Sequence, residues 1–304
     1  MKKSGQFYLI GLLIIVVGIM WGTYQQAIDI TTFSQFKPEK KASLHKPVRY
    51  FGVVSRYTPR EIFQGYQPIM DYLTKNTSYQ FELKLSSSYE GTAIQLARGD
   101  ISVAAFGSFL YVTHKDDYDL EVILQPLNKD GESINHLMFI AHESKSIQSI
   151  RDLEGLSIVL PSKESLTGQW MPLYIEQTTG IKFNDFNSIE YVSHHTTVAE
   201  LVLSGEFDVG VVKEPVAEMA IQKGLKIIHS VPVSATSPLV ISANTDSITK
   251  DEIIDAFLSL KIQSNENKDF LKNWDEEFSY GFKRSTDADY DPIRKILKSI
   301  NNIP

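Results

Sequence analysis

The sequence predicts an α/β fold of two lobes with a hinge and a central cleft. Apolar runs that suit buried strands alternate with segments that carry apolar residues at helical spacing. This alternation is typical of a parallel sheet covered by helices. It runs once over residues 48–106 and again over residues 157–229. Because ligands of such folds bind beside the carboxyl ends of the strands, we expect the site to lie in the cleft.

The elements of the first unit follow from this pattern. We expect strands at 48–54, 81–85 and 101–106, with helices at 61–75 and 89–98 between them, and a further strand at 137–141.

The second unit repeats the plan. We expect strands at 157–160, 188–192, 207–212, 226–229 and 239–243, with helices at 168–178, 197–204, 214–223 and 251–260. The first lobe would then comprise residues 47–142 and 233–304, and the second lobe residues 143–232.

Two short segments echo each other, at residues 94–106 and 201–212. Each predicts the end of a helix, a glycine (Gly99 or Gly205), an acidic residue and a buried strand. The echo favours two similar lobes, although the ordinary sequence pattern of any α/β chain would also produce it.

The N-terminus predicts export. Lys2 and Lys3 precede an uncharged apolar run at 7–22, which Thr23 and Tyr24 extend and in which Trp21 and Tyr24 are interfacial aromatics. We expect an uncleaved transmembrane helix within residues 1–24 and a polar tether at 25–46, which place the body on the periplasmic face of the inner membrane. A cleaved signal peptide, which would leave the protein free in the periplasm, is the alternative.

Composition narrows the function classes. The net charge of −7 argues against a nucleic-acid partner, whose phosphates need clustered lysine and arginine. The absence of cysteine excludes disulfides, thiol catalysis, cysteine-ligated zinc and lipid anchoring through a cysteine. No nucleophile elbow, phosphate loop or zinc-protease motif is present, so we expect no enzyme, no cofactor and no metal site.

Residues 157–172 contain the most informative pattern. A short strand is followed by the hydroxyl residues Ser162, Ser165 and Thr167 and by Gly168, where a helix should begin. A helix N-terminus offers unpaired N–H groups and partial positive charge, so it binds anions without a lysine. The same residues also suit an ordinary helix cap.

The order and spacing of several segments resemble the phosphate/phosphite/phosphonate-binding periplasmic proteins of ABC transporters, which have a type II periplasmic-binding fold. The resemblance covers about residues 47–260 and is carried by these segments: Phe51–Val54, Tyr66–Pro68, Tyr72–Leu73, Ser88–Gly91, Gly99–Tyr111, Ile150–Gly155, Ser165–Pro172, Ser193–His195 and Gly205–Asp208.

The resemblance implies a set of ligand-binding residues. Its anion-binding turn corresponds to Ser165, Thr167 and Gly168, with Leu166 where the family often has a hydroxyl, and its ligand-binding histidine corresponds to His195. It further implies cleft aromatics and an acidic residue that could meet an amino group: Tyr89, Phe106, Tyr111 and Glu214. Each also has a structural interpretation, as a packing aromatic, a helix-capping histidine or a first-turn acid.

Two functions fit these residues. The first is a solute-binding protein that captures a small phosphonate-like or phosphate-like anion for an ABC permease. The second is a membrane-tethered sensor that reports cleft closure to a kinase or second-messenger enzyme. Both depend on ligand contacts with two lobes that favour the closed state.

Overall fold

The computed structural model describes residues 46–235, 237–260 and 270–301. The predicted membrane anchor at residues 1–24, and all but the last residue of the predicted tether, lie outside these ranges. Among the described helices, none combines the length and the apolar composition that a membrane span requires.

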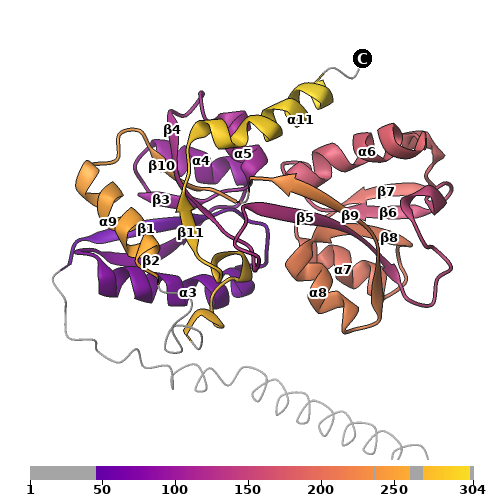
Figure 1. The fold of residues 1–304 in the computed structure, drawn as a ribbon, viewed down its shortest axis with the longest axis horizontal. Helices are drawn as coiled ribbons and strands as arrows, with labels where there is room; N and C mark the ends of the chain where they lie inside the picture. The colour runs from indigo at the N-terminus through magenta and orange to yellow at the C-terminus, as the bar shows by residue number, and fades with distance from the viewer. Residues whose placement is uncertain (1–45, 236, 261–269, 302–304) are drawn as a thin grey trace, which may run out of the picture. The chain divides into compact units, whose positions relative to one another are not determined.

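The first lobe is built on a six-stranded sheet with the order β11-β4-β10-β3-β1-β2 (Figure 1). Its parallel strands are joined by helices as predicted, and β10 runs antiparallel between β3 and β4. The strands are β1 (Val48–Val53), β2 (Gln80–Leu85), β3 (Val103–Ala105), β4 (Leu120–Pro126), β10 (Leu239–Ser242) and β11 (Phe282–Arg284). The helices are α3 (Pro59–Asn76), α4 (Tyr89–Ala97), α5 (Ser108–His114) and α9 (Ser247–Leu258).

The second lobe is built on a five-stranded sheet with the order β7-β6-β8-β5-β9. Its strands are β5 (Ile134–His142), β6 (Ser157–Leu160), β7 (Ser188–Tyr191), β8 (Val209–Lys213) and β9 (Leu225–Ser234). Its helices are α6 (Leu166–Thr179), α7 (His195–Leu203) and α8 (Glu214–Ile221). We had placed residues 134–142 in the first lobe, but β5 pairs antiparallel with β8 and β9, so it belongs to the second sheet.

The two echoed segments adopt the same local structure. Helices α4 and α7 are each followed by a glycine in the left-handed region, Gly99 with φ of 76° and Gly205 with φ of 78°. A residue with a side chain is strained in that region, so glycine ends both helices at low cost. After each glycine the chain enters a buried strand, β3 or β8, at the centre of its sheet.

The C-terminal part of the chain contains elements that the sequence pattern did not predict. The acidic run at residues 287–291 forms a 3-10 turn, η4 (Asp287–Tyr290), that leads into helix α11 (Asp291–Asn301). Helix α11 packs against α5 of the first lobe and α6 of the second.

Two apolar clusters form the core, and each takes side chains from both sheets. One lies beneath α3 and α9 in the first lobe and beneath α7 and α8 in the second. The other lies beneath α4 and α5 in the first lobe and beneath α6 in the second. The chain passes between the lobes after β4 and again after β9, so these two connections hold the lobes side by side (Figure 1).

Candidate functional site

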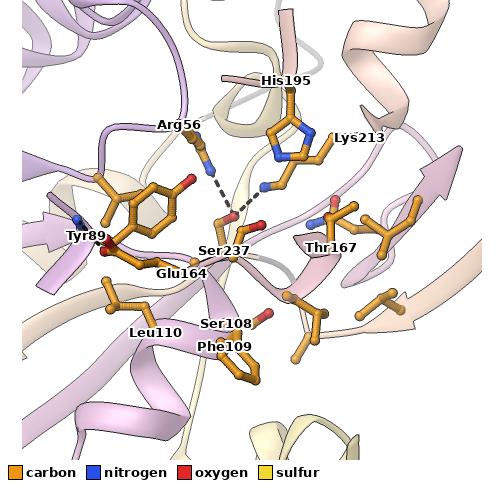
Figure 2. A pocket seen from close by; sticks show the side chains of 18 residues that line it. Arg56, Tyr89, Ser108, Phe109, Leu110, Glu164, Thr167, His195, Lys213 and Ser237 are labelled. Carbon is orange, nitrogen blue, oxygen red and sulfur yellow. Dashed lines mark hydrogen bonds between the residues drawn. The ribbon is translucent and has the colours of Figure 1, made fainter. Parts of the chain in front are cut away.

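A cavity of about 50 Å³ lies where the lobes meet. The first lobe contributes residues after β1 and at the starts of α4 and α5, and the second contributes the starts of α6 and α7 and the end of β8. The connections between the lobes complete the wall (Figure 2). A water molecule needs about 10–15 Å³ of such space, so the cavity suits a ligand of only a few non-hydrogen atoms.

Four of the predicted ligand-binding residues line this cavity: Tyr89, Ser165, Thr167 and His195. They come from the N-terminal ends of α4, α6 and α7, which face the cavity from both lobes. All four side chains are buried. The cavity thus brings helix N-termini and polar side chains together, the combination that binds small anions.

At the start of α6, Ser165 was expected either to bind an anion or to cap the helix. The Ser165 hydroxyl accepts a hydrogen bond from the backbone N–H of Gly168 at 3.1 Å and donates to the Ser162 carbonyl at 2.7 Å. The side chain therefore caps its own helix. Thr167, in the first turn, has no hydroxyl partner among the described residues and lies beside the cavity (Figure 2). Its hydroxyl is available to a ligand.

His195 opens helix α7 and is only 2% exposed. Its Nδ1 atom is buried without a hydrogen-bond partner among the described residues. Burial, together with the positive charge of Lys213, lowers the pKa of His195 to about 3. The imidazole is therefore neutral at pH 7, with one donor and one acceptor nitrogen. A buried polar atom without a partner costs free energy unless a bound molecule or water satisfies it.

Two cations that the sequence analysis did not select also line the cavity, Arg56 after β1 and Lys213 at the end of β8. Both form ion pairs with the carboxylate of Glu277, which is buried. The hydroxyl of Ser237 accepts from Arg56 Nη1 at 3.0 Å and from Lys213 Nζ at 3.1 Å, and donates to Glu277 at 3.0 Å (Figure 2). This charged cluster links the first lobe to the second, because Lys213 is the only member on the second sheet.

The electrostatics of the cluster follow from its burial. Burial alone would raise the pKa of Glu277, but the adjacent Arg56 and Lys213 lower it to about 2. Burial lowers the pKa of Lys213, and the Glu277 carboxylate opposes that shift. A second carboxylate, Asp275, lies 3.5 Å from the Arg56 guanidinium. Burial raises the pKa of this group.

The cluster retains donors that it does not use. An ammonium has three N–H donors, and two of those on Lys213 point to Ser237 and Glu277. The Nε atom of Arg56 is buried with no partner within the described part of the chain. An anionic ligand could therefore meet the remaining N–H donor of Lys213. We had expected amides and hydroxyls to bind the anion without a lysine, and Lys213 lies beside them in the lining of the cavity.

The other four predicted residues do not line the cavity. Phe106 is fully buried in the core, and Tyr111 donates its hydroxyl to Asp287 at 2.9 Å. The backbone N–H of Gly168 is used by the helix cap. Glu214 lines a separate pocket, where its carboxylate lies 3.0 Å from Nδ1 of His136. The structure places these residues in the core, in a helix cap and in side-chain pairs, and their role in ligand binding stays a prediction.

The fold and the cleft together define a two-lobed α/β protein with a cavity between its lobes. The chain matches the family of periplasmic substrate-binding proteins of phosphonate ABC transporters over residues 51–290, and it belongs to that family. The family assignment confirms the resemblance on which the sequence analysis relied.

Solved structures agree on the fold. A binding protein component of an ABC phosphonate transporter from Pseudomonas aeruginosa aligns with a TM-score of 0.74 at 21% identity, over 84% of this chain and 87% of that one. PhnD1 from Prochlorococcus marinus, solved in complex with methylphosphonate, aligns with a TM-score of 0.72 at 18% identity, over 84% of this chain and 99% of that one. The periplasmic aliphatic sulphonate binding protein of Escherichia coli aligns with a TM-score of 0.58 at 11% identity, over 84% of this chain and 85% of that one.

Proposed function

We propose that this protein captures a small oxyanion of the phosphonate or phosphate type in the interlobe cavity and delivers it to an ABC permease. The single observation that supports this most is the convergence on one cavity of His195, the cation Lys213 and the start of α6. The N–H groups, the Thr167 hydroxyl and the ammonium all donate to an oxyanion, and charge-assisted hydrogen bonds of this kind are the strong ones.

The proposed site does not carry a large excess of positive charge. Arg56 and Lys213 share Glu277, and Asp275 lies beside the guanidinium. We therefore expect the ligand to be bound mainly through directed hydrogen bonds and helix N-termini rather than through net charge. Such a site would distinguish oxyanions by geometry and by the number of acceptor oxygens.

The test is calorimetry of the purified full-length chain with methylphosphonate, phosphate and methanesulfonate. We expect one equivalent of at least one phosphorus oxyanion to bind. His195→Ala should weaken binding by about 1–3 kcal/mol, because it removes a buried hydrogen-bond partner of the ligand. His194→Ala is the matched control, since His194 is adjacent in sequence but does not line the cavity. No binding of any phosphorus oxyanion, or equal losses in both variants, would contradict the proposal.

Delivery to a permease needs a separate test. We propose that the protein acts outside the cytoplasm, held at the inner membrane by residues 1–24 or released into the periplasm if they are cleaved. In proteoliposomes containing the cognate permease and ATPase, the loaded protein should stimulate ATP hydrolysis. Binding without stimulation would instead favour the membrane-tethered sensor.

A further inference from the structure

A carboxylate of the second lobe contacts the first lobe at the wall of the cavity. Glu164 lies in the turn before α6, and its Oε2 atom accepts the backbone N–H of Tyr89 at 3.0 Å and that of Glu90 at 3.4 Å. These are the first two residues of α4. The contact is therefore a direct link between the lobes, made by a side chain that itself remains exposed.

The two N–H groups have no partner within their own helix. The N-cap residue of α4, Ser88, uses its hydroxyl for the N–H of Gly91. The N–H groups of the first turn otherwise face outward, and the helix N-terminus attracts negative charge. Glu164 thus supplies an anion of the protein's own to a place where a free anion would also bind.

Glu164 also lies between two cavities. It lines the cavity of about 50 Å³ and an outer pocket of about 320 Å³, and the only other residues that line both are Phe109 and Leu110. Figure 2 shows these side chains along one side of the inner cavity. His195 also lines the inner cavity.

We propose that Glu164 is a gate that determines specificity: its link to α4 closes the inner cavity over a small head group and excludes ligands whose substituent would extend into the outer pocket. This inference rests on the proposed function and deepens it, because it limits the substrate class to oxyanions with a short substituent. Without the Glu164 side chain the two cavities would join, and a longer substituent could pass between Phe109 and the start of α4.

The test compares ligands that share a head group and differ in length. Dissociation constants are measured for methylphosphonate and n-butylphosphonate in the full-length protein and in Glu164→Ala. We expect the wild type to favour methylphosphonate. The variant should shift the ratio of the two constants toward n-butylphosphonate by about tenfold or more, since each fitted methylene is worth about that much. It should also release methylphosphonate faster.

Glu90→Ala is the matched control. Glu90 lines only the outer pocket, and its carboxylate accepts from Tyr118 within the first lobe, so this variant removes the same charge and leaves the interlobe link intact. The ratio of its two dissociation constants should match that of the wild type. An unchanged ratio in Glu164→Ala, or an equal shift in Glu90→Ala, would overturn the gate while leaving the proposed function standing.

A ligand-free measurement separates the two proposals. The chain has no cysteine, so spin labels can be attached uniquely through Lys75→Cys on α3 and Asn184→Cys in the second lobe, both exposed. We expect Glu164→Ala to broaden the distribution of distances between the labels. If no phosphonate binds to the wild type, the proposed function fails and this measurement alone decides the gate. Identical distributions in both backgrounds would overturn it.

Discussion

Glu277 should be the most costly single charge to remove from the cleft. It is 8% exposed and is the shared acceptor of Arg56, Lys213 and Ser237. Glu277→Gln keeps the shape of the side chain but leaves two buried cations with much weaker compensation. Breaking a buried ion pair by removing one partner costs about 3–5 kcal/mol. At about 2–4 °C per kcal/mol for a domain of this size, the melting temperature should fall by about 6–20 °C.

The assay is urea and thermal unfolding, followed by circular dichroism. Glu276→Gln is the matched control, because the adjacent carboxylate is changed in the same way and forms no ion pair among the described residues. The loss should also depend on pH. The folded-state pKa of Glu277 is about 2, below its ordinary value of 4.5. Its contribution is therefore complete above about pH 4.5 and is lost as the pH falls toward 2.

The same variant should respond more strongly to anions. With Glu277 neutral, Arg56 and Lys213 need a counter-charge, and an anion that binds only the folded state raises its stability by mass action. Added methylphosphonate or sulfate should therefore stabilise Glu277→Gln more than the wild type. A variant within about 1 kcal/mol of the wild type in stability, with the same response to anions, would refute the reasoning on buried charge.

Further predictions concern the walls of the cavity. His195→Gln should make the free energy of unfolding less sensitive to acid. Because the pKa of His195 is about 3 in the folded state, the unfolded state binds more protons between pH 6.5 and 3. This group alone should therefore lower the free energy of unfolding of the wild type by about 2 kcal/mol from pH 6.5 to 5. An identical pH profile of urea unfolding in both proteins would contradict it. Gly168→Ala should lower the free energy of unfolding in urea by about 1–3 kcal/mol, because a Cβ there would lie 2.2 Å from the Ser162 carbonyl oxygen. A Cβ at Gly107 would meet nothing within 4 Å, so Gly107→Ala should be near neutral. Equal effects of the two alanines would argue against this packing. Ser165→Ala should lower stability by about 1 kcal/mol, because it removes a helix cap. In calorimetry it should change ligand affinity less than Thr167→Val does. A larger effect of Ser165→Ala would assign Ser165 to the ligand.

The sequence was sufficient for the elements that have a strong local pattern. The cap at Ser165 and the start of α6 were predictable because hydroxyls, a strand and a glycine lie within a few residues of each other. His195 was found through its place in the family order. The lobe assignment of β5 was wrong because strand pairing depends on partners far away in the chain, which an apolar run does not identify.

The charged cluster was missed for two different reasons. Arg56 and Lys213 follow the carboxyl ends of predicted strands, where cleft ligands are expected, so the rule that located the cleft could have selected them. Ser237 and Glu277 lie in a connection and in a C-terminal segment with no distinctive pattern. Only the folded chain brings them within hydrogen-bond distance of each other. Tyr111, predicted as a cleft aromatic, is outside the lining of the cavity and donates its hydroxyl to Asp287.

The most direct test of the central claim is a crystal structure of the protein grown with methylphosphonate. We predict phosphonate oxygens inside the cavity, within hydrogen-bond distance of a ring nitrogen of His195 and of the Thr167 hydroxyl, with Glu164 still bonded to the start of α4. A ligand bound elsewhere, with a water molecule on His195 and the cavity otherwise unchanged, would contradict the account.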